Sequence, residues 1–348
     1  MNSLKQFRAL DGVRAIAAFM VIFFHYFIAV HPSTQLLSLI KTIAVFGQTG
    51  VSLFFVLSGF LITRILLNSK EDNNYFKNFY ARRSLRIFPL YFLFLIFYFY
   101  VVPLLVEVNN NASGWFYWVY LQNVAMTFNW DNYGPLHFWS LAVEEHFYLF
   151  WPFIVYFFNL NKIFVSGLIL IIISLFLRFY LTSASFETFY FTFTRMDDLV
   201  LGTFLAILEK KCLLGFRSKK IFAYTLVFLF ILNLVPWLFI DLISHFWLQV
   251  FKYPLIASFY FALIGYLISD MDSKTTAFFK FSWLRFSGKI SYGLYVYHPV
   301  VFLLGTKYIH LNNVFIDFCV LVLFTFILST LSFYIFENQF IKLKRYFE

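Results

Sequence analysis

Apolar residues occupy the chain in long runs separated by short polar segments. Ten runs approach the roughly 20 residues that a helix needs to cross a bilayer. They cover residues 9–31, 44–67, 87–106, 137–158, 162–182, 196–209, 221–240, 246–269, 286–309 and 314–337. The loops between them are too short for a second folded unit. The pattern therefore predicts an all-α, polytopic membrane protein in which residues 1–348 form one transmembrane domain.

The segment 107–136 does not follow this pattern. Its apolar stretch from Trp115 to Met126 is too short to cross a bilayer. We expect an interfacial or re-entrant helix on the outer side of the membrane.

Composition and charge narrow the class further. The chain is 61% hydrophobic and only 13% charged, and its mean hydropathy is +0.77, which excludes a soluble domain. A net charge of +10 would suit nucleic acid, but most Lys and Arg residues cluster on one side of the predicted spans. The positive-inside rule explains such clusters, so we expect contact with membrane lipids and none with nucleic acid. The same asymmetry predicts an even number of crossings and both termini in the cytoplasm.

The two cysteines and the N-terminal segment add little chemistry. Cys212 and Cys319 are predicted on opposite sides of the membrane, so they should form neither a disulfide nor a metal site. Residues 1–30 are not expected to be a cleavable signal, because the apolar stretch is of full membrane length and contains Arg14 and His25.

Arg14 and His25 lie on one face of the first predicted span. Their separation of eleven residues is about 20° past three full turns and a rise of roughly 16 Å. Burying ionisable groups in a bilayer is costly, so this face either lines a polar path, or Arg14 extends to the interface and His25 packs between helices. A histidine can accept a proton near pH 7, which makes His25 the candidate base.

Three arginines precede the third predicted span. Arg82, Arg83 and Arg86 lie within five residues at its cytoplasmic mouth. Guanidinium groups bind phosphate through paired, charge-assisted hydrogen bonds. The cluster is therefore either a phosphate site or a positive anchor for lipid head groups.

Polar residues also begin the fourth predicted span. His137, Ser140, Glu144 and Tyr148 follow helical spacing and share a face, whereas Glu145 points elsewhere. Two adjacent glutamates at the start of a membrane helix favour a function or a buried pairing over a purely structural role.

A fourth polar group, Arg195, Asp197 and Asp198, lies at the outer start of the short span 196–209. These residues either bind the hydroxyl groups of a sugar or form an ion-paired helix start, since acids are favourable at the positive end of the helix dipole.

The span 286–309 brings a second histidine to mid-depth. Ser291, Tyr295 and His298 share one face, and His298 lies roughly 18 Å from the start of the helix. Pro299 loosens the local backbone bonding and is expected to bend the helix.

Taken in order, these stretches resemble the acyltransferase-3 membrane proteins, which O-acetylate bacterial surface polysaccharides. The resemblance covers essentially the whole chain. Ser52 and His146 depart from the Asp and Gln of many relatives, so we assign no catalysis to them. The likeness rests on Asp11–Arg14 with the Arg-x10-His spacing to His25, on Gly50–Thr63, on Arg83-x-x-Arg86-Ile87, on Trp139-Ser140-Leu141-x-x-Glu144-Glu145 and on Ser291-Tyr292-x-x-Tyr295-x-x-His298.

The resemblance implies a multi-pass protein of the bacterial cytoplasmic membrane, with acetyl-CoA as acyl donor and no metal. Arg83 and Arg86, together with Arg14, would hold the phosphates of acetyl-CoA on the cytoplasmic side. The pantetheine arm would then follow the polar face of the first helix toward His25. The acceptor would be a hydroxyl of a polysaccharide or lipid-linked glycan.

The resemblance also implies candidate roles around the thioester. His25 would deprotonate the acceptor hydroxyl or take the acetyl group itself. Glu144 would orient or charge-balance a histidine, and Tyr295 or His298 would stabilise the oxyanion. Ser291 completes the set of expected substrate contacts.

Two other functions fit the same residues. A transporter or flippase of lipid-linked sugars would use the charged path without chemistry, and an acyltransferase for a lipid or small secreted molecule would differ in acceptor alone. Some family members carry an additional extracytoplasmic SGNH-type domain. Because Glu348 follows the last span by about a dozen residues, we expect the transfer to be completed by the membrane domain or by a separate partner.

Overall fold

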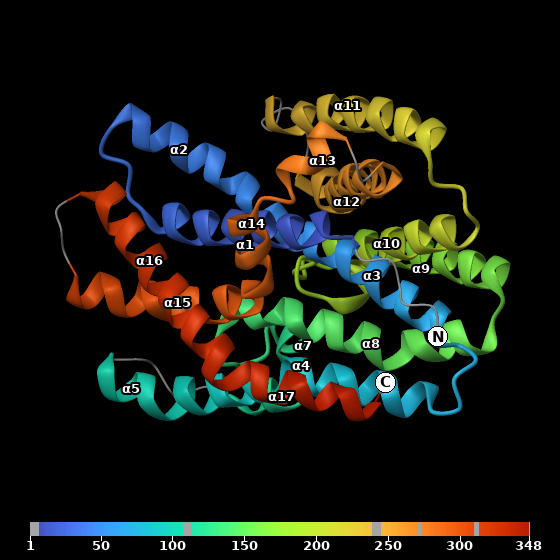
Figure 1. The fold of residues 1–348 in the computed structure, drawn as a ribbon. Helices are drawn as coiled ribbons and strands as arrows, with labels where there is room; N and C mark the ends of the chain where they lie inside the picture. Colours follow the sequence, from blue (N-terminus) through green and yellow to red (C-terminus); the bar gives the residue numbers. More distant parts are fainter. Residues whose placement is uncertain (1–6, 107–112, 239–244, 271–272, 310–312, 348) are drawn as a thin grey trace.

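The computed structural model of the protein is helical throughout (Figure 1). It describes residues 7–106, 113–238, 245–270, 273–309 and 313–347, and every structural statement below concerns these residues. The described part contains no strand, only an isolated β-bridge between Ser113 and Asn132. The all-α prediction is therefore confirmed. Cys212 and Cys319 are both free.

The longer helices set the architecture, and most of their bounds lie within a few residues of the predicted ones. They are α1 (Ala9–Ala29), α2 (Gln35–Val45), α3 (Gly50–Asn68), α4 (Tyr75–Ile96), α8 (Trp139–Phe157), α9 (Leu160–Ser183), α10 (Met196–Lys210), α11 (Phe216–Leu238), α12 (His245–Ser269), α15 (Ser291–Tyr308) and α16 (Val314–Ser332). The shorter elements are η1 (Phe46–Thr49), η2 (Phe97–Val101), α5 (Val102–Leu105), α6 (Trp115–Trp118), α7 (Gln122–Thr127), η3 (Leu136–Phe138), η4 (Thr192–Thr194), α13 (Lys274–Phe278), α14 (Ser282–Lys289), η5 (Phe333–Glu337), α17 (Asn338–Lys342) and η6 (Leu343–Phe347).

Several of these helices are long and apolar enough to cross a membrane. Among the described residues, six segments meet that criterion by length and composition: Ala9–Ala29, Gln35–Asn68, Tyr75–Leu105, Leu160–Ser183, His245–Ser269 and Val314–Phe347. The protein is therefore multi-pass. The last two residues of the predicted span 221–240 lie outside the described residues.

The helix predicted for 87–106 begins a full three turns earlier than expected. α4 starts at Tyr75, so the whole arginine cluster lies within the helix instead of before it. The prediction was wrong because it followed hydrophobicity alone. Arginine is a good helix former, and no Gly or Pro interrupts residues 75–88. The arginines consequently project from a rigid element at fixed angles.

Two other predicted spans are interrupted. The 3₁₀ turn η1 separates α2 from α3, so the predicted span 44–67 contains the end of α2, this turn and most of α3. The span 286–309 is two helices, because the chain turns at Ile290 between α14 and α15. At this break α14 packs directly on α1: a Cβ added to Gly288 would lie 1.8 Å from the carbonyl oxygen of Asp11.

The segment 107–136 forms two short helices instead of one. α6 and α7 are separated by Tyr120, whose φ of 58° lies in the left-handed region and ends the first helix. The Tyr91 hydroxyl of α4 donates to the Tyr117 carbonyl at 2.7 Å, and Gln122 Nε2 donates to the Phe138 carbonyl at 2.8 Å. Residues 107–112 of the predicted element lie outside the described residues.

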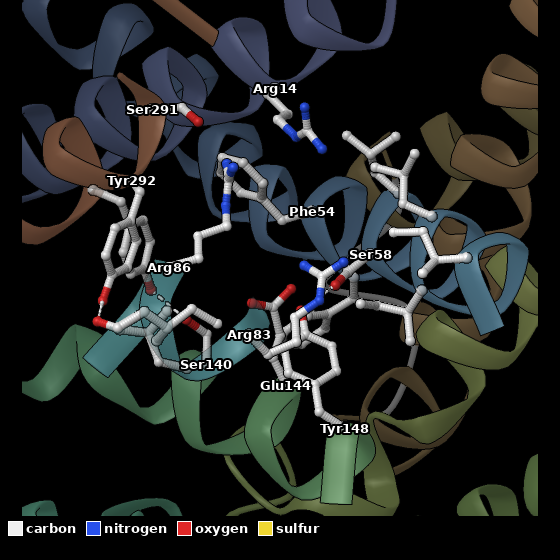
Figure 2. Close-up of a pocket in the computed structure, with 18 of the residues that line it drawn as sticks. Arg14, Phe54, Ser58, Arg83, Arg86, Ser140, Glu144, Tyr148, Ser291 and Tyr292 are labelled. Atoms are coloured by element: carbon white, nitrogen blue, oxygen red, sulfur yellow. Dashed lines mark hydrogen bonds between the residues drawn. The ribbon is translucent and has the colours of Figure 1, made fainter. Parts of the chain in front are cut away.

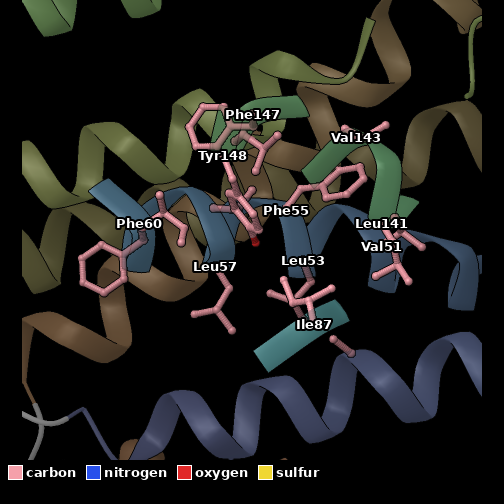
Figure 3. Close-up of a cluster of buried hydrophobic side chains, with 14 of the residues drawn as sticks. Val51, Leu53, Phe55, Leu57, Phe60, Ile87, Leu141, Val143, Phe147 and Tyr148 are labelled. Carbon is pink, nitrogen blue, oxygen red and sulfur yellow. The ribbon is translucent and has the colours of Figure 1, made fainter. Parts of the chain in front are cut away.

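The core forms around α3, whose buried side chains lie beside those of α4 and α8 (Figure 3). The helix that packs most closely against α3 is α10. A Cβ added to Gly59 would lie 1.8 Å from the Leu199 carbonyl oxygen, and one added to Gly202 would lie 2.0 Å from the Val56 carbonyl oxygen. Small residues let membrane helices approach this closely and gain packing energy, since lipid supplies no hydrophobic drive between helices. The Thr63 and Thr203 hydroxyls add a hydrogen bond of 2.8 Å across the same contact.

We expect Gly59→Ala to destabilise the protein by about 1–3 kcal/mol, because the new methyl group meets backbone that cannot move aside. The measurement is thermal unfolding of purified protein in detergent. Gly215→Ala is the control, since no atom lies within 4 Å of its added Cβ. Equal unfolding temperatures for the two variants would contradict the close α3–α10 contact.

Candidate active site

A cavity of about 360 Å³ lies between α1, α3, α4, α8, α15 and η6 (Figure 2). It brings together residues that are far apart in the sequence and that sequence analysis proposed separately. Six predicted site residues line it: Arg14, Arg83, Arg86, Glu144, Ser291 and Tyr295. Candidate site residues from four different helices therefore face one space.

The cavity wall is strongly basic. The Arg14, Arg83 and Arg86 side chains all face the space in Figure 2. Arg14 Nη1 donates to Asp11 Oδ1 at 2.7 Å. Asp11 lies one turn earlier on α1, so this ion pair orients the Arg14 guanidinium. Arg83 lies over the Tyr148 ring, with 5.6 Å between its Cζ and the ring centroid. These contacts orient two of the arginines before any ligand arrives.

Two further basic residues line the cavity. Arg82 Nη1 donates to the Phe347 carbonyl at 2.5 Å, which ties α4 to η6 and brings Lys344 to the wall. Sequence analysis did not propose Lys344, because a lysine near the C-terminus has no local feature that separates it from the other basic residues of the segment.

Glu144 is an acidic group in the basic wall. Its carboxylate lies beside Arg83, Ser58 and Tyr148 (Figure 2). The Ser58 and Tyr148 hydroxyls are 2.5 Å apart. The helical face predicted for Ser140, Glu144 and Tyr148 does face the cavity, and Glu144 lies among arginines instead of beside a histidine.

Tyr295 and Ser140 close the inner end of the cavity. The Tyr295 hydroxyl donates to the His137 carbonyl at 2.6 Å and lies 2.5 Å from Ser140 Oγ. Ser140 Oγ also donates to the His137 carbonyl at 3.3 Å, and either hydroxyl can donate in the contact between Ser140 and Tyr295. On its far side, the Tyr295 ring lies 5.9 Å from the ring of His298, measured between centroids.

Behind Tyr295, the two candidate histidines meet. His25 Nδ1 lies 2.7 Å from His298 Nε2, and the two rings stack at 5.0 Å with an interplanar angle of 16°. His298 is fully buried, while His25 is half-buried. Neither residue lines the cavity itself, so Tyr295 separates the arginine-lined space from the histidine pair.

The hydrogen bonds determine which histidine of the pair donates and which accepts. His298 Nδ1 lies 3.0 Å from the Leu294 carbonyl, which can only accept, so Nδ1 carries the proton. Neutral His298 then accepts at Nε2, and His25 donates from Nδ1. His25 Nε2 consequently keeps its lone pair free for proton transfer. The geometry makes His298 the group that orients His25.

Arg195 and Asp197 lie outside the cavity, in a buried network at the start of α10. Arg195 Nη2 donates to Asp198 Oδ2 at 2.6 Å and to Ser52 Oγ at 2.7 Å. Arg178 Nη2, from α9, donates to Asp197 Oδ2 at 2.7 Å. The structure thus favours the ion-paired helix start over sugar binding. Arg178 was not proposed as a partner, since its sequence position indicates only that it falls within a span.

Comparison with known proteins places the whole chain in one family. The acyltransferase-3 family profile, described as an acyltransferase domain, matches residues 7–334. The peptidoglycan O-acetyltransferase OatA of Listeria monocytogenes is 30% identical, over 97% of this chain and 56% of that protein. The O-acetyltransferase OatA of Staphylococcus aureus is 27% identical, over 97% of this chain and 58% of that protein. The chain spans about half the length of these curated relatives. No solved structure matches it.

We expect Asp197→Ala to lower stability by about 3–5 kcal/mol, because it leaves the fully buried Arg178 guanidinium without its counter-charge. Thermal unfolding in detergent measures the effect. Lys219→Ala is the matched control: it removes a partly exposed pair with Asp270, and such pairs contribute at most about 1 kcal/mol. An Asp197→Ala protein that unfolds with the control would show that the network is not structural.

Proposed function

Since this chain belongs to the acyltransferase-3 family, we propose that it is a transmembrane O-acyltransferase. It moves an acetyl or similar acyl group from cytoplasmic acyl-CoA to a hydroxyl of a polysaccharide on the outer side. Because two relatives are named OatA and one of them is named a peptidoglycan O-acetyltransferase, a cell-wall or lipid-linked glycan is the proposed acceptor.

One observation carries the proposal: the arginine-lined cavity ends at Tyr295, whose other side contacts the histidine pair. A cavity with phosphate-binding groups at its mouth and a base beyond its inner end fits a long molecule with phosphates at one end and a thioester at the other. Acyl-CoA has this form. Arg83 and Arg86, with Arg14, would bind its phosphates by charge-assisted hydrogen bonds.

The chemistry assigned to the site is general-base catalysis by His25. Its free Nε2 takes the proton of the acceptor hydroxyl while the hydroxyl oxygen bonds to the thioester carbonyl carbon. The tetrahedral intermediate then collapses, the carbon–sulfur bond breaks, and the proton passes from His25 to the departing CoA sulfur. The products are the O-acyl ester and free CoA. His298 holds the His25 ring in place by accepting a hydrogen bond from the His25 Nδ1–H group.

Tyr295 occupies the position at which donor and base must meet. Its hydroxyl is bonded to the His137 carbonyl and to Ser140, and rotation of the side chain would open the cavity toward His25. Released from the carbonyl, the same hydroxyl would donate to the oxyanion. Glu144, beside Arg83, would balance the charge of the arginines around the donor. Ser291 would contact the pantetheine arm from the cavity wall.

The proposal fixes a topology as well. Acyl-CoA is cytoplasmic and the glycan is extracytoplasmic, so the arginine end of the cavity must face the cytoplasm. We therefore retain ten crossings, both termini in the cytoplasm, and location in the bacterial cytoplasmic membrane as parts of the proposal. The asymmetry of Lys and Arg in the sequence supports this orientation.

We expect His25→Ala to lower transfer by 100-fold or more, the usual contribution of a general base, with acyl-CoA binding retained. Arg86→Ala should instead raise the KM for acyl-CoA about tenfold, the effect of losing one charge-assisted hydrogen bond. Release of free CoA by membranes and mass spectrometry of the glycan and lipid fractions measure both variants. His31→Ala, an exposed histidine beyond the end of α1, is the control.

Undiminished glycan acetylation in His25→Ala at normal membrane levels would remove this residue from the mechanism. A purified protein that binds glycolipid but consumes no acyl-CoA would indicate a flippase. Acyl groups found in the lipid fraction alone would change the acceptor.

A further inference from the structure

A second cavity lies directly beside the first, at the junction of α1, α4, α14, η5 and α17. Its volume is about 570 Å³. Arg14 and Arg86 line both cavities, so the two spaces meet at these arginines. Beyond them, the second cavity adds two basic residues that the proposed function does not use, Arg285 and Lys289.

The break between α14 and α15 places these basic residues. Arg285 and Lys289 are four residues apart on α14 and therefore share a helical face. The direct contact of Gly288 with the Asp11 backbone holds that face against α1, next to Arg14. Lys289 Nζ lies 4.9 Å from the centroid of the Phe333 ring, which also lines the cavity.

Basic residues outnumber acidic residues in the wall of the second cavity. Asp11 is the one acidic residue in its wall, and its Oδ1 already accepts from Arg14. Arg285 Nε is buried and has no hydrogen-bond partner among the described residues. Four basic side chains thus face one acid that is already engaged, which is the pattern of a site for a multiply charged anion.

We propose that the second cavity binds the nucleotide end of the acyl-CoA, with Arg285 and Lys289 holding the ribose 3′-phosphate. This rests on the proposed function. Arg14 and Arg86, at the junction, then contact the diphosphate, and the pantetheine arm runs from there into the first cavity toward Tyr295. Phe286 and Phe333 provide apolar wall for the adenine ring.

This arrangement matches the layout of the donor. Acyl-CoA has two separate phosphate groups, with the diphosphate between the adenosine and the pantetheine arm. The chain has two cavities joined at two arginines. The first has apolar side chains and hydroxyl groups in its wall beside its basic residues, and the second adds Arg285 and Lys289. A single cavity lined by Arg83 and Arg86 would not distinguish CoA from 3′-dephospho-CoA. If the second cavity holds the 3′-phosphate, the protein should bind CoA more tightly than 3′-dephospho-CoA.

The test is direct binding of CoA and 3′-dephospho-CoA to the purified full-length protein in nanodiscs, without turnover. The wild-type protein should bind CoA at least tenfold more tightly, the effect of one charge-assisted phosphate contact. In Arg285→Gln and Lys289→Gln the affinity for CoA should fall to about the affinity for dephospho-CoA. The affinity for dephospho-CoA should stay unchanged, which shows that the variants are folded. Arg217→Gln, an exposed arginine near the start of α11, should keep the wild-type preference.

The outcomes separate this proposal from the function on which it rests. If the wild-type protein binds both ligands equally, or if the variants keep the preference for CoA, the proposed role of the second cavity is overturned. The proposal that acyl-CoA is the donor would then still stand. Equal loss of both ligands in the variants would also overturn the proposed role of the second cavity. Binding of neither ligand by wild type would overturn the donor as well. A preference that disappears when phosphatidylglycerol is added would assign the cavity to a lipid phosphate.

Discussion

The close approach of helix backbones at a few glycines is the constraint on which the rest of the structure depends. In a bilayer, apolar side chains gain little by leaving lipid for protein, so helices associate through packing and hydrogen bonds. Gly59 and Gly202 let α3 and α10 touch through their backbones, and Gly288 does the same for α14 and α1. The first contact builds the core beneath the cavity. The second brings Arg285 and Lys289 beside Arg14.

A second constraint separates the buried arginines into two groups. A charge within an apolar bundle must be paired or must face a polar space. Arg178 and Arg195 are paired with Asp197 and Asp198, and they join α3, α9, α10 and α12 with no exposed surface. Arg83 and Arg86 face the cavity instead. The charges of the first group are paired within the protein, whereas the basic excess of the second is what an anionic donor would neutralise.

In the histidine pair, the fold determines which ring nitrogen carries the proton. The Leu294 carbonyl, one turn before His298 in α15, fixes the His298 proton on Nδ1. His298 Nε2 therefore accepts a hydrogen bond from His25 Nδ1, and the lone pair of His25 Nε2 stays free. Tyr295 belongs to both regions, since it lines the cavity and contacts the His298 ring. Donor and base are thus kept apart by one side chain.

The sequence by itself determined the helical class, most helix positions and the faces of α8 and α15, because hydrophobic runs and helical spacing are local properties. Its motifs also identified the family. Only the tertiary structure decided where α4 begins, which arginines are paired, and that Lys344 joins the cavity, because these depend on contacts between distant residues. The second cavity is of the same kind: residues from Asp11 to Ile341 line it, and no local pattern indicates that these segments meet.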